Sequence, residues 1–596
     1  MPPELGEIVW KIGGEQGQGL DPTSDVFATV CNRMGYWVYA YKTFSSRIKG
    51  GHTDFTVRVS QERKLSPAPK LNMLVAIDQE SIDLLVEDLA DDGILLADSG
   101  FHPQAPDGVK MITADLTKMA RELGNPVYRN MIAVGCSAQV LGIPLEPFRE
   151  YVQEKFGRKG EAVVQENWRA LDMGAQIAID QLGDTVFSLG VPDGKNDRLI
   201  VTGNDAMTLG ALAAGCRAVF AYPITPASEV LEVAAKLFPR YGGVAVQMED
   251  ELSALGAVIG AGFAGARALT STAGPGISLM QELMGLAGMT EVPCVIIDTQ
   301  RGGPSTGMPT KHEQSDLFAL IHGGHGEAPR IVLAPGTGEQ AFYDAALAFN
   351  LADNYHCPVI IASDLGLALW QQTVDPFDIS KVVIDRGPIV EQSYLDTIGS
   401  DGFERYADSD RGVSARSFPG MKNGQYLATG AEHGRTGKVT ESPTNRVRMM
   451  DRRKRKLDRI EIGGKPVPGV ELTGPERPDV LLISYGSTIG AVHEAAQNLA
   501  AEGISVGVCQ VRLLNPLPVQ ELTALVNGAR QVIVIENNSE GQLAYLMRAN
   551  RVPYGNVHSM LKYDGTLFRG DEVTAKVKAM IAVPQAAQRP AHEVRA

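Results

Sequence analysis

Short apolar runs alternate with helical patterns along most of the chain. Near the start, EIVWKIGG, YWVYAYKTF, DFTVRVS, LNMLVAID and GILLADS are predicted strands, and helical spacing begins after the glycine-rich loop GGEQGQG. The alternation resumes at LIVTGNDAMTLGALAAG and again at VLLISYG, ISVGVCQVR and QVIVIENN. Strands that alternate with helices in this way predict doubly wound sheets of the α/β class.

Weaker patterns divide the chain into four segments. The polar stretch GVPDGKNDRL is typical of a linker, and the alternation fades before a basic run, NRVRMMDRRKRKLDR. A chain of 596 residues has room for three to four domains of ordinary size. We expect domains at 1–190 and 196–373, an extension with a basic linker at 374–470, and a C-terminal domain at 471–596.

Composition and charge narrow the class of protein. The net charge of −15 argues against nucleic acid as the main partner, because phosphate binding needs a basic surface. The longest weakly polar run, Leu252–Ala266, has 15 residues and is too short to span a bilayer. MPPELGEIVW lacks the features of a secretory signal, so we expect a cytoplasmic protein that binds no membrane. The six cysteines are scattered singly, which predicts neither a disulfide framework nor a metal or cluster site on this chain.

The segment VFAYPITPASEV ends an apolar strand in a threonine between two prolines. Pro223 and Pro226 fix their own φ angles and push Tyr222 and Thr225 toward extended geometry. The Thr225 hydroxyl is therefore held on a stiff corner before the helix that follows. Open α/β sheets bind ligands at such strand ends, although an ordinary proline-rich turn explains the pattern equally well.

An acidic run follows the strand that ends at Met248. Glu249, Asp250 and Glu251 are predicted in the first helical turn, where carboxylates interact favourably with the helix dipole. Glu251 lies one residue before the apolar stripe, so we expect it to face inward and to hold or share a proton. The G-x-G-x-x-G match at 260–265 falls late in this helix, so helix packing explains it better than nucleotide binding.

Four ordered motifs resemble a known family. They are YPITPASE, EDELSALGAVIGAGFAGARALTSTAGPG, TQRGGPSTGMPTKHEQSDL and GHGEAPRIVLAP, and SSRIKGGHT precedes them. Together they resemble the α subunit of the thiamine-diphosphate-dependent 2-oxoacid:ferredoxin oxidoreductases, with a γ region fused in front, and most of all the 2-oxoglutarate enzymes. The resemblance covers nearly the whole chain. It implies a γ-type domain, a pyrimidine-binding domain and a transketolase C-terminal-like domain.

The resemblance also implies roles for individual residues near the cofactor. Glu251 aligns with the carboxylate that hydrogen-bonds the aminopyrimidine and so assists removal of the C2 proton. Tyr222, Pro223 and Ile224 belong to the same cofactor-binding motif. Thr225 aligns with a residue that positions the 2-oxoacid.

Three cations are implied at the substrate. Arg301 aligns with a cation near the substrate carboxylate, whose planar shape suits a guanidinium group. Lys311 stands where related enzymes often have arginine, so it keeps the positive charge but lacks the planar set of N–H donors of a guanidinium group. Lys49 aligns with a lysine at the far end of the pocket, although without the family context a solvated surface lysine is the ordinary interpretation. Ala227 replaces a usual serine, which puts in doubt any hydrogen bond from that side chain.

The motifs that are missing imply a partner. The sequence contains no G-D-G followed by N-N, the family's signature for Mg²⁺ and the diphosphate, and no cluster cysteines. The resemblance therefore implies a β subunit that brings the Mg²⁺ site and a 4Fe–4S cluster, in a heterotetramer of two α and two β subunits. Ferredoxin and CoA would be the further partners. The basic segment Arg446–Arg459 suggests either a contact with CoA phosphates or, more simply, a solvated face.

We therefore expect an enzyme subunit that oxidatively decarboxylates 2-oxoglutarate with CoA and ferredoxin to succinyl-CoA and CO₂. The same reaction run in reverse would fix CO₂, as in a reductive TCA cycle. Two alternatives stay open. One is the same chemistry on pyruvate or on a branched-chain or aryl 2-oxoacid, and the other is a non-catalytic nucleotide-binding electron-transfer subunit with flavin at its glycine loops.

Overall fold

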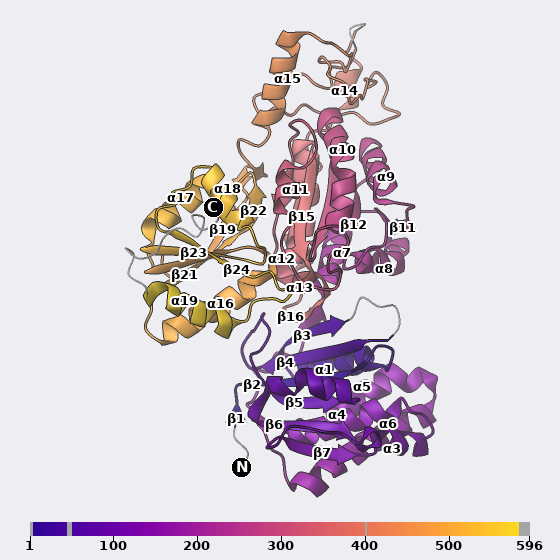
Figure 1. Ribbon diagram of the computed structural model, residues 1–596. Coiled ribbons are helices and arrows are strands. Elements are labelled where there is room, and N and C mark those ends of the chain that lie inside the picture. The colour runs from indigo at the N-terminus through magenta and orange to yellow at the C-terminus, as the bar shows by residue number, and fades with distance from the viewer. Residues whose placement is uncertain (1–3, 45–49, 400–401, 583–596) are drawn as a thin grey trace. The chain divides into compact units, whose positions relative to one another are not determined.

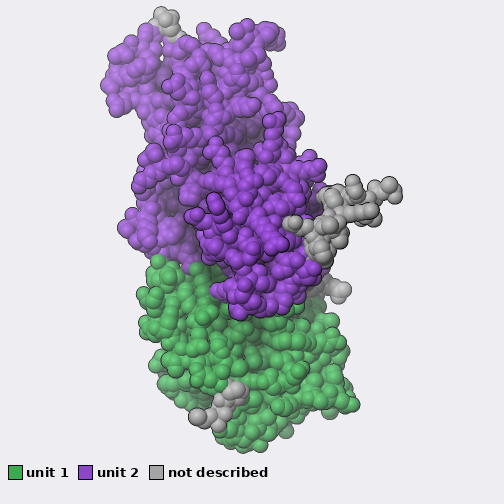
Figure 2. All heavy atoms as spheres, turned by 90° about the vertical axis from the view of Figure 1, so that its left-hand side faces the viewer, with its two compact units in different colours: residues 1–201, 370–376, 569–571 green, residues 202–369, 377–568, 572–596 purple. Residues whose placement is uncertain are grey.

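The computed structural model describes residues 4–44, 50–399 and 402–582 and divides into two compact units (Figures 1 and 2). The first unit comprises residues 1–201, 370–376 and 569–571, and the second comprises 202–369, 377–568 and 572–596. Both units are mixed α/β structures, so the predicted fold class is confirmed. Among the described residues, no helix combines the length and apolarity needed to cross a membrane.

The first unit is built on one eight-stranded sheet in the order β7-β6-β5-β2-β4-β3-β16-β9. Strands β2, β5, β6 and β7 are parallel, but β3 and β4 form an antiparallel hairpin, so the sheet is mixed. Trp10 of β2 stacks on Phe27 of α1 at 4.6 Å between ring centroids and donates to Ser137 Oγ of α4 at 2.8 Å, which fastens both helices to the sheet. The elements are β2 Glu7–Glu15, α1 Leu20–Arg33, β3 Trp37–Phe44, β4 His52–Ser60, β5 Leu71–Ala76, α2 Gln79–Leu85, β6 Leu89–Asp98, β7 Lys110–Ala114, α3 Leu116–Glu122, α4 Tyr128–Val140, α5 Glu146–Phe156, α6 Glu161–Leu182, β9 Leu199–Val201 and β16 Gln371–Val374, with a small pair of β1 Glu4–Leu5 and β8 Ser188–Leu189.

The second unit contains a seven-stranded sheet in the order β11-β10-β12-β13-β15-β14-β22, parallel except at β22. Helices α9, α10 and α11 bury apolar residues such as Leu255 and Met284 against Ile296 and Ile360 of the strands. Helices α7 and α12 pack together closely, since a Cβ on Gly210 would lie 2.0 Å from a carbonyl oxygen of α12. The elements are α7 Gly203–Ala213, β10 Ala218–Ala221, α8 Ser228–Leu237, β11 Val244–Gln247, α9 Glu251–Phe263, β12 Ala268–Thr272, α10 Gly274–Thr290, β13 Cys294–Gln300, α11 Leu317–His322, β14 Ile331–Leu333, α12 Gly338–Tyr355, β15 Pro358–Asp364, α13 Leu365–Leu369 and β22 Leu513–Asn515.

A five-stranded sheet in the order β19-β21-β20-β23-β24 completes the second unit. Its residues Leu481 and Cys509 belong to the same apolar cluster as helices α9 to α11, so the two sheets share one core. The elements are β19 Val470–Thr473, β20 Val480–Ser484, α16 Ile489–Ala501, β21 Val506–Val511, α17 Val519–Gly528, β23 Gln531–Glu536, α18 Gln542–Ala549, β24 Val557–Leu561 and α19 Gly570–Ala582. Of α19, the part from Glu572 onward belongs to the second unit.

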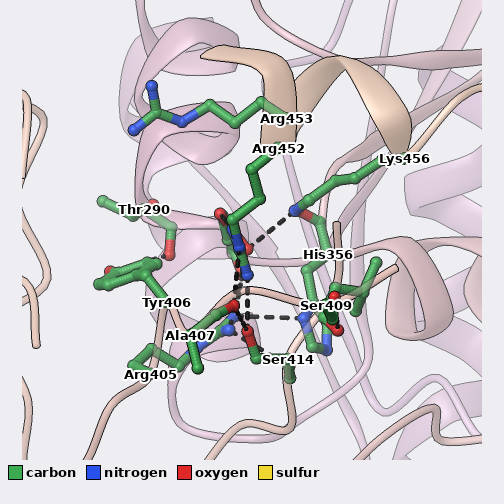
Figure 3. Close-up of polar contacts among 12 residues, drawn as sticks. Thr290, His356, Arg405, Tyr406, Ala407, Ser409, Ser414, Arg452, Arg453 and Lys456 are labelled. Carbon is green, nitrogen blue, oxygen red and sulfur yellow. Dashed lines mark hydrogen bonds and ion pairs between the residues drawn. The ribbon is translucent and has the colours of Figure 1, made fainter. Parts of the chain in front are cut away.

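The predicted extension, 374–470, starts three residues later in the second unit, because residues 374–376 belong to the first unit. Buried charges hold residues 377–470, which we call the extension from here on, to the rest of the second unit. The extension contains α14 Gln392–Leu395, α15 Pro443–Arg455, β17 Glu461–Ile462 and β18 Lys465–Pro466. Arg452 and Lys456, both labelled in Figure 3, are fully buried. Both pair with Glu291, which directly follows α10. The interpretation of the whole basic segment as a solvated face is therefore wrong, because tertiary packing supplies an internal acid for these cations.

Candidate functional site

The predicted site residues of the second unit gather at the carboxyl edge of the seven-stranded sheet. This is the edge at which β10, β12 and β13 end and at which α8, α9 and α10 begin. Parallel strands present their loops and helix N-termini together at this edge, which is where α/β sheets bind ligands. Motifs that follow one another along the chain therefore lie at the same edge of the sheet.

The proline corner lies between β10 and α8. Tyr222 and Pro223 are exposed, and Ile224 and Thr225 are half-buried. Behind the corner, Asn204 of α7 is fully buried and its amide donates to the Pro226 carbonyl at 2.9 Å, which holds the turn in place. Nothing in the local sequence distinguishes Asn204 from other polar residues near a helix start, so its role could not be predicted from the sequence.

Glu251 is the first residue of α9 and is only 6% exposed. Asp250 is the N-cap, since its side chain accepts from the Ser253 N–H at 2.7 Å. The helix therefore starts later than predicted, and of the three acids only Glu251 lies in the first turn. Glu251 is buried, so it faces inward as predicted.

The first turn of α10 packs tightly against Glu251. A Cβ on Gly276 would lie 2.7 Å from Glu251 Cγ and 1.9 Å from Thr272 Oγ1, distances that a real Cβ essentially never shows. Glycine is thus required at 276 for α10 to approach β12 and α9 this closely. The contact fixes the Glu251 side chain from one side.

Arg301 follows β13 and lies next to the proline corner. Arg301 is buried, and its guanidinium donates from Nη1 to the Thr225 carbonyl at 2.5 Å, while Nε has no partner among the described residues. Lys311 is half-buried and closes the loop that Arg301 begins, because its carbonyl accepts from the Gly302 N–H at 3.0 Å. Lys49 lies outside the described residues.

Two further acids lie at the same edge, and of these Asp298 is buried and Asp316 is half-buried. Asp298, on β13, is fully buried and neither of its carboxyl oxygens has a hydrogen-bond partner among the described residues. Asp316 precedes α11 and its Oδ2 is also unpartnered there. A lone acid inside the apolar run CVIIDTQ is the signal that could have identified Asp298 from the sequence.

The electrostatics of these two acids favour their protonated forms. Burial, and then the nearby charge of Asp316, raise the pKa of Asp298 well above its ordinary value. Burial, and then the charge of Glu313, raise the pKa of Asp316 to about 7, although Arg301 acts in the opposite direction. Burial therefore favours the protonated form of both acids, and each opposes the ionisation of its neighbours.

The outer face of α9 has no partner in the described chain. Leu252, Gly256 and Gly260 are exposed along it, and a Cβ on Gly260 would meet nothing within 4 Å. Helix packing therefore explains only part of the glycine motif. Gly262 does pack, since its Cβ would lie 2.3 Å from the Pro293 carbonyl oxygen.

Comparison with known proteins gives consistent matches over nearly the whole chain. Residues 9–177 match the family described as pyruvate ferredoxin/flavodoxin oxidoreductase, and residues 209–451 match its thiamine-diphosphate-binding domain. Residues 478–573 match core domain II of pyruvate:ferredoxin oxidoreductase.

Individual relatives cover the same span. The 2-oxoacid:ferredoxin oxidoreductase 2, subunit alpha, of Aeropyrum pernix is 33% identical over 96% of this chain and 97% of its own. The 2-oxoglutarate oxidoreductase subunit KorA of Mycobacterium tuberculosis is 30% identical over 97% of this chain and 92% of its own. The solved 2-oxoglutarate:ferredoxin oxidoreductase of Magnetococcus marinus, with 2-oxoglutarate, coenzyme A and succinyl-CoA bound, is 35% identical with a TM-score of 0.90 and covers 97% of this chain and 100% of that one. The chain therefore belongs to the α subunits of the 2-oxoacid:ferredoxin oxidoreductase family.

Proposed function

We propose that this subunit, together with a β subunit, oxidatively decarboxylates 2-oxoglutarate with CoA and ferredoxin to succinyl-CoA and CO₂. The observation that carries the proposal is the buried carboxylate of Glu251 at the start of α9, at the same edge of the sheet as the corner where Arg301 meets Thr225. The similarity to the Magnetococcus marinus enzyme, whose structure holds 2-oxoglutarate and succinyl-CoA, supports the choice of acid.

The residues at this edge fit thiamine diphosphate. A single buried carboxylate, fixed by the close approach of Gly276, suits a ring nitrogen that must gain and lose a proton. When bound, the cofactor supplies a nucleophilic carbon and an electron sink for decarboxylation. Glu251 would hold a proton at the aminopyrimidine, and Tyr222, Pro223 and Ile224 would line the same region.

The substrate would lie between the proline corner and the loop after β13. Arg301 would pair with the carboxylate next to the 2-oxo group, because its Nε lacks a partner within the described part of the chain and its Nη1 already holds the Thr225 backbone in place. Thr225 would position the oxoacid, and Lys311 would add positive charge. Lys49 would bind the distal carboxylate, since an unpaired buried carboxylate is strongly penalised.

We place the Mg²⁺ site and the 4Fe–4S cluster on the β subunit, in a heterotetramer of two α and two β subunits. The exposed, uncharged face of α9, which begins at Glu251, is the surface that such a partner would cover. Exposed apolar residues of this kind mark protein interfaces. Covering this face would also exclude water from Glu251.

The test is to purify the chain alone and with its β partner and to assay a panel of 2-oxoacids. The lone chain should be colourless and inactive, and an isolated chain that is brown and contains iron would overturn the assignment of the cluster. The complex should turn over 2-oxoglutarate faster than pyruvate or branched-chain acids. A preference for pyruvate would show that the substrate is wrong while leaving the chemistry in place.

Lys49→Ala tests the substrate assignment further. It should raise KM for 2-oxoglutarate, with a loss in kcat/KM of roughly ten- to a hundredfold, and leave pyruvate nearly unchanged. Lys70→Ala is the matched control, because this lysine is exposed and donates to the Glu87 carbonyl. An equal loss with both acids would remove Lys49 from the distal contact.

A further inference from the structure

The loop that carries Lys311, residues 301–316 between β13 and α11, has two parts that are held differently. Its outer part, 303–308, is exposed. Its inner part, 312–315, hydrogen-bonds to loops of the five-stranded sheet, which belongs to the same unit. The inner part therefore connects the proposed substrate loop to that sheet.

The backbone of Gln314 is the centre of this connection. Gln314 is fully buried, and its N–H donates to the carbonyl of Asn537, directly after β23, at 2.7 Å. Its own carbonyl accepts from the hydroxyl of Tyr485, directly after β20, at 3.0 Å and from the Asn538 side-chain amide at 3.1 Å. Both backbone polar groups of Gln314 are thus satisfied by the five-stranded sheet.

The side chain of Gln314 joins the two sheets of the second unit. Its Nε2 donates to Asp364 Oδ2, at the end of β15, at 2.9 Å and to the Tyr485 carbonyl at 3.2 Å. The Thr488 hydroxyl lies 3.0 Å from Gln314 Oε1, and Asp364 Oδ2 also accepts from the Ser487 N–H at 2.9 Å. All of these residues are buried, so a shift of the loop would leave polar atoms unpaired away from water.

Lys311 stands where the outer and inner parts of the loop meet. A Cβ on Gly565, in the segment after β24, would lie 2.9 Å from Lys311 Cβ, a distance that a real Cβ essentially never shows. The next residue, His312, donates its N–H to the Gly565 carbonyl at 3.0 Å. On the outer side, the Lys311 N–H donates to the Met308 carbonyl at 3.0 Å. The position of Lys311 therefore depends on the contact of the inner part with the five-stranded sheet.

We propose, building on the proposed function, that the five-stranded sheet positions Lys311 for the substrate. Gln314 is the positioning residue, and Thr488 is the partner that holds its side chain from the sheet. The physical reason is that ordering a loop during binding reduces affinity, and the buried hydrogen bonds of Gln314 order this loop before the substrate arrives. Loss of the Thr488 contact should therefore weaken substrate binding and leave the proton chemistry at Glu251 unchanged.

The test compares Thr488→Val with Thr488→Ser in the complex of this chain with its β subunit. Valine has a similar shape without the hydroxyl, whereas serine keeps the hydroxyl. KM for 2-oxoglutarate should rise about two- to tenfold in Thr488→Val and stay near the wild-type value in Thr488→Ser. Ser484→Ala is the control, because its hydroxyl is buried in the same sheet but donates to the Ile535 carbonyl. C2 proton exchange of bound thiamine diphosphate should be unchanged in all three variants.

A double-mutant cycle distinguishes positioning from a general loss of structure. If Thr488 acts through Lys311, Thr488→Val should add little to the rise in KM that Lys311→Ala causes alone. Fully additive effects, or an equal rise in KM in Ser484→Ala, would overturn the inference. If Thr488→Val does not fold, Tyr485→Phe takes its place in the cycle, because it removes only the hydroxyl that donates to the Gln314 carbonyl.

Hydrogen exchange of the loop separates this inference from the proposed function. In Thr488→Val the backbone N–H groups of residues 302–314 should exchange faster than in the wild type and in Ser484→Ala. Exchange at the wild-type rate would overturn the inference. Faster exchange with an unchanged KM would also overturn it, and because the loop had then loosened, the fault would lie with the proposed role of Lys311. A complex that turns over no 2-oxoacid would overturn the proposed function, whereas hydrogen exchange would still decide whether the sheet holds the loop.

Discussion

The two edges of the seven-stranded sheet both bury acids, but they surround them differently. At the amino edge, burial alone would raise the pKa of Glu291, yet Lys456, Arg452 and Arg405 together lower it to about 2. At the carboxyl edge, burial and Asp316 act in the same direction on Asp298 and raise its pKa. Similar burial therefore produces an ionised acid at one edge and a protonated one at the other.

A second cluster repeats the pattern of the amino edge. Asp353, near the end of α12, contacts Arg267 at 2.9 Å, Arg386 at 2.9 Å and Arg416 at 2.6 Å. Two of these arginines belong to the extension, as do the cations around Glu291. Cations of the extension thus bind acids at the C-terminal ends of α10 and α12 and so attach the extension to the sheet. The helix dipole also favours positive charge at a helix C-terminus. The comparison shows that nearby cations keep a buried acid ionised at the amino edge, whereas burial beside another acid favours the protonated form of Asp298 at the carboxyl edge.

The largest expected effect is at the carboxyl edge. Glu251→Gln in the assembled enzyme should slow C2 proton exchange of bound thiamine diphosphate by about a hundred- to ten-thousandfold without unfolding the chain, because general acid–base help is lost. Exchange is followed by deuterium incorporation. Glu249→Gln is the control, since this exposed acid lies outside α9 and should exchange normally. Normal exchange in Glu251→Gln would leave Glu251 only as a helix-dipole acid.

Breaking the amino edge should cost stability instead. Glu291→Gln leaves three buried cations without their acid, and such a loss typically destabilises by about 3 to 5 kcal/mol. Chemical denaturation and proteolysis of the extension would measure it. The exposed pair of Glu502 and Lys578 is the control, and Glu502→Gln should change stability by roughly 1 kcal/mol or less. A Glu291→Gln chain as stable as this control would contradict the comparison.

Lowering the pH should reduce the stability that Glu291 contributes at the amino edge, over a defined pH range. The pKa of Glu291 in the folded chain is about 2, below its ordinary 4.5, so its contribution is present above pH 4.5 and is lost as the pH falls toward 2. The difference corresponds to roughly 3 kcal/mol. Denaturation curves between pH 6 and 2 should show this slope in the wild type. In Glu291→Gln the slope should be reduced by one group, and an unchanged slope would show that other acids dominate.

The smallest expected effect is that of Asp298→Asn, which tests whether the acids of the two edges differ in ionisation. Asp298→Asn replaces a protonated acid by a neutral group of similar shape, so at neutral pH the free energy of unfolding should change by about 1 kcal/mol or less. Equilibrium denaturation at pH 7 measures this change. A loss as large as that of Glu291→Gln would mean that Asp298 is ionised and paired, and the two edges would then not differ in kind.

Much of the fold was predictable from the sequence because it follows from local patterns. The period of apolar residues predicts the strands and helices, and the prolines around Thr225 predict the corner before α8. The inward position of Glu251 follows from the apolar stripe of α9. The start of α9 was placed too early because the capping bond from Asp250 to Ser253 cannot be distinguished from a first helical turn by composition.

Other features depend on residues far apart in the chain. Strand β16 joins the sheet of the first unit beside β3, although its sequence follows that of the second sheet. Asp298 and Asp316 lie at the same edge of the sheet only when β13 and the loop before α11 fold together.

By itself, the sequence determined the fold class, the family and the residue types available to the site. The tertiary structure decided which charges meet. Arg452 and Lys456 looked solvated in the sequence and are buried on Glu291, whereas Asp298 looked like part of an apolar strand and has no hydrogen-bond or ion-pair partner among the residues that the structure describes. The reason is that periodicity is a property of neighbours in the chain, while the energy of a buried charge depends on partners that only the complete fold brings within reach.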